Sequence, residues 1–387
     1  MNKNKGALKI QKNVFWMGIT SLFTDMSSEM IYPILPIFLT STLGISKAFI
    51  GLIEGIAEST ASILKIFSGW FSDKFKRRKS PVVFGYSLSA IAKPLLALAN
   101  SGIFVLFLRF FDRVGKGIRT SPRDALISES TPKEQIGRAY GFHRAMDTLG
   151  AVIGPLLAFL ILPMLGENIR PLFLIAFIPA MLAVILLWIF VKEKRRETSN
   201  ETREFKISLA PFNLRFKLFV FIVFLFTLGN SSNAFLILRA QSVGVAVFLI
   251  PILWLMFNSV YTVVAMPAGI ISDTIGRKKV IIAGYIIYSM VYFGLAYVNS
   301  PLILWLLFAF YGIHYGLTDG VERAFISDIS PKRYKATAFG VYHAAVGFAL
   351  LPASVIMGVL WQSLGPVVAF SFGGILAAVS AFLLTFI

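Results

Sequence analysis

Charged side chains inside apolar sequence are the feature of this chain that could do chemistry. The stretch from Leu108 to Pro155 begins and ends in hydrophobic residues. Between them it carries Arg109, Asp112, Arg113, Lys116, Arg119, Arg123, Asp124, His143, Arg144 and Asp147. Charge in the apolar interior of a membrane is unfavourable unless it faces a wet cavity or a partner. We therefore expect two membrane spans that line the polar half of a transport pathway.

Acidic side chains recur at helical spacing in the first two apolar stretches. Asp25 and Glu29 are four residues apart, and so are Glu54 and Glu58. Residues at this spacing share one face of a helix. A carboxylate that alternates between a desolvated environment and a nearby cation can take up a proton on one side of a membrane and release it on the other. We predict proton coupling first for Asp25 and Glu29, and next for Glu58 and Asp147.

Basic side chains form a stripe on the span that follows Leu108. Arg113 is the best candidate to displace a proton or to hold an anionic group, because a guanidinium stays charged and offers a bidentate fork. Arg109 and Lys116 would contribute if the solute carries a carboxylate or a phosphate. The predicted solute-binding residues are Tyr32, Arg109, Arg113, Lys116, Arg119, His143, Arg144, Asn230, Asn233, Tyr311 and Tyr315.

The same charges also have a purely structural interpretation. Acids and bases occur in comparable numbers on these spans, so many of them must pair with one another. Breaking one buried pair would leave an uncompensated ion at a cost of about 3–5 kcal/mol. Glu54 could instead lie near the outer surface and be solvated, while Lys65 and Arg123 could extend to the inner surface.

The composition indicates that membrane-spanning helices position these residues. The chain has 387 residues, of which 57% are hydrophobic and 14% are charged. A soluble domain is roughly 45–50% apolar and about 25% charged. Because a span needs about 20 apolar residues, twelve spans with short loops would nearly use up the chain. We predict an all-α integral membrane protein with twelve transmembrane helices in two pseudo-symmetric bundles of six.

The apolar stretches give the approximate position of each span. The first three are expected at 14–39, 48–71 and 81–99, and spans 4 and 5 occupy the charged stretch to about residue 165. The others are expected at 171–191, 215–238, 245–271, 279–298, 301–327, 336–362 and 366–387. The segment 192–214 is too polar to span. We expect it to be a cytoplasmic linker between an N-terminal bundle, residues 1–191, and a C-terminal bundle, residues 215–387.

The distribution of basic residues predicts the topology. The net charge is +18, but the Lys and Arg residues concentrate in alternate loops, as is typical of cytoplasmic loops rather than of a nucleic-acid-binding surface. Both termini are therefore expected in the cytoplasm, and the protein in the cytoplasmic membrane. No small-residue cleavage site follows the first apolar run, which indicates a retained span rather than a signal peptide. The chain has no cysteine, so disulfides and thiol chemistry are excluded.

An internal repeat relates the two halves. GWFSDKFKRRK at Gly69 recurs as GIISDTIGRKK at Gly269, with an offset of 200 residues. DALISESTPK at Asp124 recurs as RAFISDISPK at Arg323, with an offset of 199. Such a repeat indicates duplication of a six-span unit. Transporters built from paired halves place their site between these halves, near the middle of the membrane.

The repeat is not symmetric in charge. Five charged residues of the first half have neutral counterparts in the second half. The pairs are Glu29 with Asn233, Arg113 with Gly312, Lys116 with Tyr315, Arg119 with Thr318 and Asp147 with Val346. If the charges served folding alone, both halves would tolerate neutral residues at these positions. We infer that the charge-dependent work belongs to the N-terminal half and that the C-terminal half supplies neutral contacts.

These motifs resemble those of the major facilitator superfamily of secondary transporters. Gly69-x-x-x-Asp73-Lys74-x-x-Arg77-Arg78 resembles the signature loop between spans 2 and 3 of that family, and the copy at Gly269 lies between spans 8 and 9. Arg113-x-x-Lys116-Gly117 resembles its span 4 motif. Gly150-x-x-x-Gly154-Pro155 resembles the span 5 motif associated with drug–proton antiporters.

The resemblance implies a gating loop and a hinge. In the family, the acid and base of the loop bind neighbouring inner helix ends and favour the outward-facing state. The matching residues are Gly69, Asp73, Arg77, Asp124, Gly269, Asp273 and Arg277. Gly150 and Gly154 form a small-xxx-small step, and Pro155 weakens the helix beyond it. This step is either a hinge or simply a place of close helix packing.

We predict a proton-coupled secondary transporter that moves a small organic solute by alternating access. The motifs favour an exporter that exchanges solute for protons. One alternative is a proton-coupled symporter for an anionic or zwitterionic solute that uses the span 4 bases. A second alternative is a divalent-cation transporter.

Enzymatic function is not expected. The sequence contains no H-E-x-x-H, no G-x-S-x-G and no Walker loop, and its three histidines lie on separate spans. We expect no metal site and no cofactor, with the proton gradient as the energy source. The expected partners are the solute, protons and the lipid bilayer, but no nucleic acid, and the protein is expected to be a monomer.

Overall fold

The computed structural model describes residues 10–75, 78–132, 135–166, 168–193, 210, 212–331 and 334–387. Its ordered elements in these ranges are all helices. The N-terminal half contains α1 (Lys12–Ile31), α2 (Leu35–Ile37), the π-helix η1 (Phe38–Thr42), α3 (Lys47–Phe75), α4 (Lys79–Ala97), α5 (Gly102–Glu129), α6 (Ile136–Leu165) and α7 (Arg170–Phe190). The predicted all-α fold is therefore confirmed.

The C-terminal half is helical in the same way. It contains α8 (Leu214–Gly229), α9 (Ala234–Ser242), the short 3-10 helix η3 (Val247–Leu249), α10 (Ile250–Ile275), α11 (Arg277–Tyr297), α12 (Pro301–Ile329) and α13 (Lys335–Leu384). The backbone of α13 leaves the helical region at Gly365, where φ is 86°. Glycine tolerates positive φ because it has no Cβ. This turn separates the two apolar stretches that the sequence predicts as separate helices.

Two stretches predicted as single spans are broken into separate helices. The first, 14–39, bends after Ile31, where Pro33 and Pro36 supply no backbone N–H group. The second, 215–238, is interrupted between Gly229 and Ala234 by the sequence Asn-Ser-Ser-Asn. Short polar side chains of this kind compete with helical hydrogen bonds. These breaks occupy corresponding places in the two halves.

The apolar surface of the helices fits a membrane environment. Within the described part of the chain, seven helical segments are long and apolar enough to cross a membrane, and all seven begin at or after Ile136. Large apolar side chains such as Met164, Met266 and Leu302 are more than 70% exposed. The long helices before Ile136 are those that carry Asp25, Glu54, Lys93 and the basic stripe, and this lowers their hydropathy.

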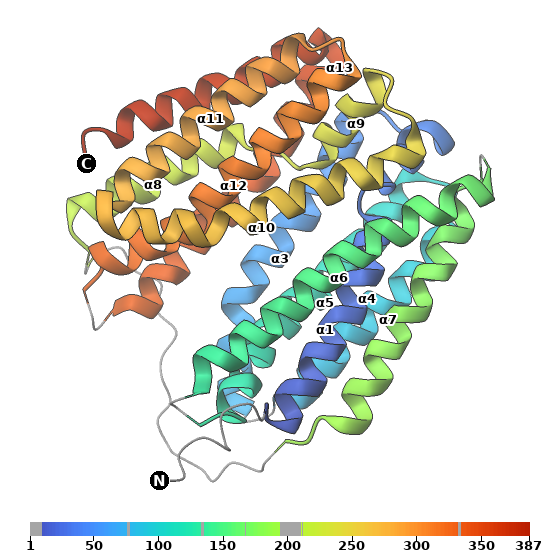
Figure 1. Cartoon of the computed structure of the whole chain (residues 1–387), viewed down its shortest axis with the longest axis vertical. Coiled ribbons are helices and arrows are strands. Elements are labelled where there is room, and N and C mark those ends of the chain that lie inside the picture. The colour runs from blue at the N-terminus through green and yellow to red at the C-terminus, as the bar shows by residue number, and fades with distance from the viewer. Residues whose placement is uncertain are drawn as a thin grey trace.

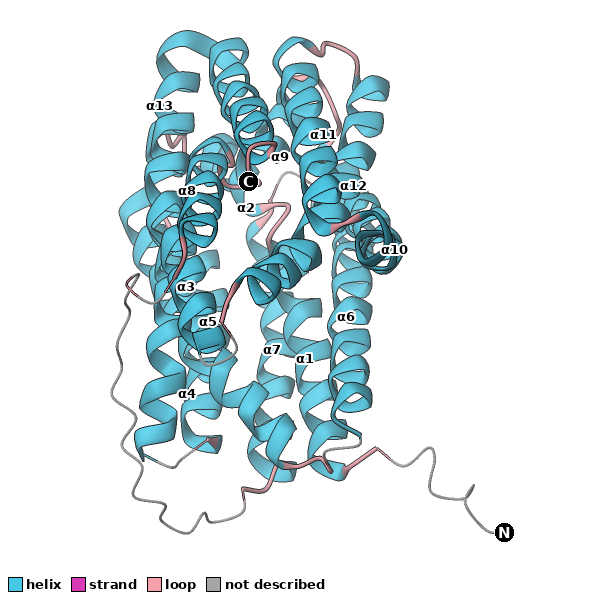
Figure 2. Cartoon of the chain, turned by 90° about the vertical axis from the view of Figure 1, so that its left-hand side faces the viewer, coloured by secondary structure: helices cyan, strands magenta, loops and turns pink. Residues whose placement is uncertain are grey.

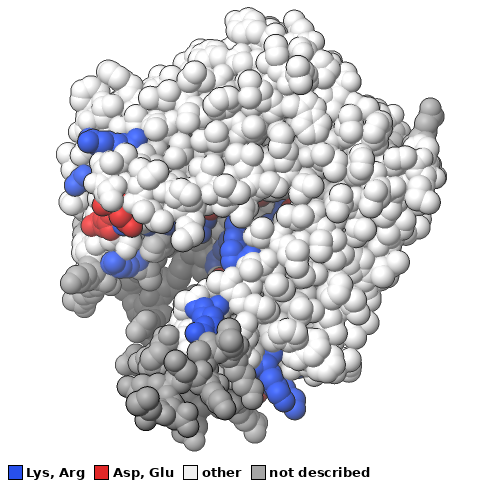
Figure 3. Space-filling model, viewed as in Figure 1, with Lys and Arg blue, Asp and Glu red and all other residues white. Residues whose placement is uncertain are grey.

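The two halves contact each other at one end and separate at the other (Figures 1 and 2). The most extensive inter-half contacts are those of α3 with α13 and of α6 with α10, and α2 also contacts α9. Gln241 Nε2 donates to Ser41 Oγ at 2.8 Å, and the Lys47 backbone N–H donates to Gln362 Oε1 at 3.2 Å. The space-filling view shows Lys and Arg side chains inside a hollow between the halves (Figure 3). Other charged side chains gather at the left edge and below the hollow, while the upper and right-hand parts of this face are almost uncharged.

Candidate functional site

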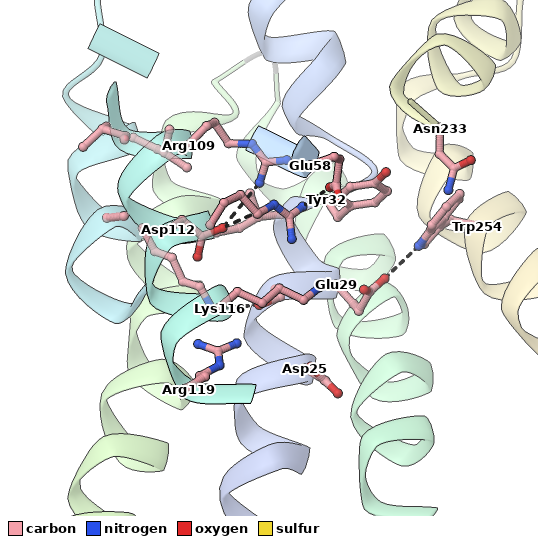
Figure 4. Close-up of a pocket in the computed structure, with 17 residues that line it drawn as sticks. Asp25, Glu29, Tyr32, Glu58, Arg109, Asp112, Lys116, Arg119, Asn233 and Trp254 are labelled. Atoms are coloured by element: carbon pink, nitrogen blue, oxygen red, sulfur yellow. Dashed lines mark hydrogen bonds and ion pairs between the residues drawn. The ribbon is translucent and has the colours of Figure 1, made fainter. Parts of the chain in front are cut away.

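Predicted site residues from several helices line one cavity of about 210 Å³ between the halves (Figure 4). Those that line it are Asp25, Glu29, Tyr32, Glu58, Arg109, Arg113, Lys116, Arg119 and Asn233. Most come from α1, α3 and α5, and one comes from the break between α8 and α9. The charged wall belongs to the N-terminal half, in agreement with the charge asymmetry of the repeat.

Glu54 and Arg109 form a buried ion pair beside this cavity. Arg109 donates from Nε and from a terminal nitrogen to the two Glu54 oxygens, at 3.1 and 2.9 Å. The Glu54 side chain is 2% exposed and that of Arg109 is 8% exposed. The expectation that Glu54 could be solvated near the outer surface is wrong, because this face of α3 packs against α5.

Arg113 is held between two carboxylates. Its terminal nitrogen lies 2.7 Å from Glu58 Oε1, and its Nε lies 4.0 Å from Asp112 Oδ2. The Nε–H has no hydrogen-bond partner among the described residues, although the atom is buried. A buried unsatisfied donor is unfavourable, so a ligand or a water that reached this N–H group would be stabilised by it.

Asp25 and Glu29 differ from the acids of α3 because no base is paired with them in the described part of the chain. Glu29 accepts one hydrogen bond, from Trp254 Nε1 of α10 at 2.7 Å (Figure 4). No hydrogen bond or ion pair of Asp25 occurs among the described residues. Both side chains face the cavity.

Three bases of the cavity likewise have no carboxylate in contact among the described residues. Lys93 donates to the hydroxyls of Ser27 and Ser28, at 2.7 and 3.2 Å. Arg119 donates to a serine hydroxyl of α4 at 2.9 Å, and its guanidinium lies 4.2 Å from the centre of the Tyr86 ring. Lys116 is exposed to the cavity. The site therefore holds separated positive and negative groups that a solute can reach.

The facing wall is neutral and aromatic. The Tyr32 and Trp254 rings lie 5.0 Å apart and meet across the boundary between the halves. Behind this wall, Tyr311 OH donates to Asn233 Oδ1 at 2.6 Å, and the Tyr315 ring packs 5.1 Å from that of Tyr311. Asn233 and Trp254 are the residues of the C-terminal half that reach the cavity.

Six predicted site residues lie away from the cavity wall: His143, Arg144, Asp147, Asn230, Tyr311 and Tyr315. Asp147 accepts a hydrogen bond from Ser21, and its other oxygen lies 3.5 Å from His143 Nδ1. Arg144 donates to Tyr261 of α10 at 3.3 Å. The solute-binding and coupling roles of these six residues stay predictions.

The predicted site set lacks several residues of the cavity. Lys93 and Asp112 are charged residues in apolar sequence, so the signal that identified Asp25 could have identified them. Trp254 is one aromatic residue in an apolar stretch, and only its position opposite Glu29 reveals it. No three His, Cys, Asp or Glu side chains in the described ranges are arranged to hold a metal ion.

The predicted hinge on α6 packs directly against the helix that carries the two unpaired acids. A Cβ atom at Gly150 would lie 2.4 Å from the Leu22 carbonyl oxygen, and one at Gly154 would lie 2.4 Å from that of Met26. Both distances are far below van der Waals contact. The glycines therefore set the position of α1, whatever hinge role they have in addition.

Replacing Gly150 by Ala should destabilise the protein by about 1–3 kcal/mol, as expected for overpacking in a tightly packed interior. Thermal unfolding of the purified protein in detergent measures this change. Gly141→Ala is the matched control, because it lies on the same helix with nothing within 4 Å of its added Cβ. Equal unfolding temperatures for the two variants would contradict the packing argument.

The gating-loop motif is described in its second copy. Arg277 lies 2.8 Å from Asp273 and 2.5 Å from Asp328 at the C-terminal end of α12, and Gly269 has open space around it. In the first copy, Arg77 and the side chains of residues 69–75, including Gly69 and Asp73, are outside the described residues. Arg78, which follows Arg77 in the sequence, lies 3.3 Å from Glu129. Asp124 pairs with Arg123 at 2.9 Å.

Apolar outer surfaces and a charged cavity between two helical halves are typical of secondary transporters. The sequence model of the Major Facilitator Superfamily matches residues 17–253 and 218–387, and the chain belongs to this family. It is a multi-pass membrane transporter and not an enzyme.

Similar proteins give the same assignment. An uncharacterized MFS-type transporter of Methanocaldococcus jannaschii is 43% identical over 99% of this chain and 97% of its own. The multi-drug resistance efflux pump PmrA of Streptococcus pneumoniae is 27% identical over 82% of this chain and 81% of its own. The cis,cis-muconate transport protein of Acinetobacter baylyi is 26% identical over 89% and 86%. A POT family transporter, solved with 5-aminolevulinic acid, has the same fold, with a TM-score of 0.81, 14% identity and coverage of 99% and 97%.

Proposed function

We propose that this chain is a proton-coupled secondary transporter of the cytoplasmic membrane, which exports a small organic solute in exchange for protons. Asp25 and Glu29 are the proposed proton sites. The observation that carries this proposal is the difference between the acids of two helices. Glu54 and Glu58 on α3 are bound to arginines, whereas Asp25 and Glu29 on α1 face the cavity and have no basic partner among the residues that the structure describes.

An unpaired carboxylate away from bulk water is unfavourable, and taking up a proton removes its charge. Binding of a cationic or hydrogen-bond-donating solute would stabilise the ionised form instead. A proton and such a solute therefore compete for Asp25 and Glu29. This competition is the physical basis of exchange, because each ligand displaces the other on opposite sides of the membrane.

The proposed transport path follows from the expected topology. The helices would cross the membrane twelve times, with both termini in the cytoplasm. The halves are joined at the end where Ser41 meets Gln241, and this end would then face outward. The cavity would open to the cytoplasm. The hydrogen bond from Trp254 to Glu29 joins the two halves, so loss of charge on Glu29 would weaken one contact between them.

A proton-coupled symporter for an anionic solute is the second candidate. Lys93, Lys116 and Arg119 have no carboxylate in contact among the described residues, and the Arg113 Nε–H is unsatisfied. Protonation of Asp25 and Glu29 would leave these bases in excess, so protons and an anion would bind together. The muconate transport protein and the POT family transporter solved with 5-aminolevulinic acid support this candidate, because both names refer to carboxylic acids.

Transport into proteoliposomes under an imposed proton gradient distinguishes the two candidates. Ethidium serves as the cationic probe, chosen because of the similarity to a multidrug pump, and cis,cis-muconate serves as the anionic probe. Antiport predicts that ethidium accumulates in vesicles with an acidic lumen. Accumulation of muconate when the outside is acidic would instead establish symport, and protein-free vesicles provide the background.

A further inference from the structure

Glu322 is a buried acid that belongs to neither the cavity nor the predicted site. It lies on α12 in the C-terminal half and is 7% exposed. The residues that line the cavity do not include it. Charge in this half is sparse, so a buried carboxyl group here needs a physical explanation.

Two tyrosines from different helices hold this carboxyl group. Tyr285 of α11 donates to Oε1 at 3.0 Å, and Tyr342 of α13 donates to Oε2 at 2.8 Å. The Tyr285 ring is fully buried and stacks on that of Phe226 at 3.9 Å. The carboxyl group thus joins α11, α12 and α13 in a desolvated position.

The charged neighbours on α12 do not supply a counterion. Arg323 forms an ion pair with Asp319, one helical turn earlier, and Asp319 also accepts a hydrogen bond from Tyr261 of α10 at 2.8 Å. No ion pair in the described part of the chain includes Glu322. The titratable groups that face it are therefore Tyr285 from α11, Tyr342 from α13, and Asp319 and Arg323 from its own helix.

The repeat shows that this arrangement is particular to the C-terminal half. At the offset of 199 residues, Glu322 and Arg323 correspond to Arg123 and Asp124. In the N-terminal half these two neighbours pair with each other at 2.9 Å. In the C-terminal half the order of charge is reversed, and the base pairs elsewhere.

We propose that Glu322 is a second proton-binding site of this transporter, separate from Asp25 and Glu29. An ionised carboxylate with neutral donors and no cation is unfavourable in a desolvated site, whereas a neutral carboxyl group is not. A tyrosine hydroxyl both donates and accepts, so Tyr285 and Tyr342 can satisfy the carboxyl group in either state. Because α13 also packs along α3 of the other half, a change of charge at Glu322 acts on a helix between the halves.

The role of this proton in transport rests on the proposed proton coupling, but its binding can be tested without any solute. The experiment is infrared difference spectroscopy of the full chain in lipid nanodiscs during a pH titration. A protonated carboxyl group gives a C=O stretching band above the amide I band, which disappears on ionisation. We expect the wild-type protein to show a band that Glu322→Gln lacks, a loss of one protonated carboxyl group per molecule.

Two further variants assign this band. Asp328→Asn is the matched control, because it removes an exposed, arginine-paired carboxylate on the same helix and should leave the band unchanged. Tyr342→Phe removes one hydrogen bond from Glu322 and should shift the band to higher frequency while its area persists. This second variant keeps the test decisive even if Glu322→Gln does not fold.

The outcomes separate the two proposals. The assignment of Glu322 would be overturned if Glu322→Gln or Tyr342→Phe gave the same carboxyl spectrum as the wild type at every pH. That result would leave the proposal of proton-coupled transport through Asp25 and Glu29 intact. Suppose instead that Glu322→Gln lacks the band but the wild-type protein shows no gradient-driven transport. The proton site at Glu322 would then stand, and the proposed function would be refuted.

Discussion

Replacing Glu54 by Gln should destabilise the protein by about 3–5 kcal/mol, the usual effect of breaking a buried ion pair from one side. Arg109 would keep its charge at a position where its side chain is 8% exposed. Asp112, at 3.5 Å from Arg109, cannot replace the lost partner, because it also faces Arg113 at 4.0 Å. Thermal and denaturant unfolding of the purified protein measure the effect.

The control for this prediction is an ion pair of similar chemistry at the surface. Asp328→Asn removes one partner of Arg277, but the Asp328 side chain is 55% exposed. An exposed pair contributes roughly 0–1 kcal/mol. The double variant Glu54→Gln/Arg109→Gln should recover much of the lost stability, because it leaves no unpaired charge. A loss for Glu54→Gln no larger than for Asp328→Asn would show that the pair is not buried in the membrane-embedded protein.

Replacing Asp25 by Asn and Glu29 by Gln together should abolish the response of the transporter to protons. Within the described ranges these are the two cavity acids that have no basic partner. Asn and Gln imitate their protonated state permanently. The chain has no cysteine, so two spin labels can be introduced at Arg138 of α6 and Lys335 of α13. Both positions are exposed and lie at helix ends of opposite halves.

We expect the distance distribution between these labels to change with pH in the otherwise wild-type protein and to be independent of pH in the double variant. The same variant should lose gradient-driven accumulation of the transported probe but keep its downhill exchange. A double variant that retains the full pH response would exclude Asp25 and Glu29 as the coupling groups.

The separation of charge between the halves has a consequence for mechanism. The N-terminal half supplies the acids and bases of the cavity, whereas the C-terminal half supplies Asn233 and Trp254. Trp254 is the residue through which the neutral half contacts a proposed proton site. A proton on Glu29 would change this inter-half contact, and Glu322 would add a second such group inside the neutral half.

The sequence alone determined where the helices lie, that the chain is built from two repeated halves and that charge concentrates in the first half. These features are encoded locally. A run of apolar residues specifies a helix, and a glycine such as Gly365 marks its end. The repeat of GWFSDKFKRRK as GIISDTIGRKK indicates the duplication without any knowledge of contacts. The breaks after Ile31 and Gly229 also have local causes, although the expected spans ran through them.

Only the tertiary structure decided which charges pair. Asp25 with Glu29 and Glu54 with Glu58 have the same spacing, so helical periodicity could not distinguish them. Because α3 packs against α5, Glu54 lies within hydrogen-bond distance of Arg109. Glu29 on α1 instead contacts Trp254, which is distant in the sequence. Spacing along α12 did not identify Glu322 as a candidate site, because its two hydrogen-bond partners, Tyr285 and Tyr342, lie on other helices. Ion pairing depends on how helices pack against one another, and spacing along one helix does not contain that information.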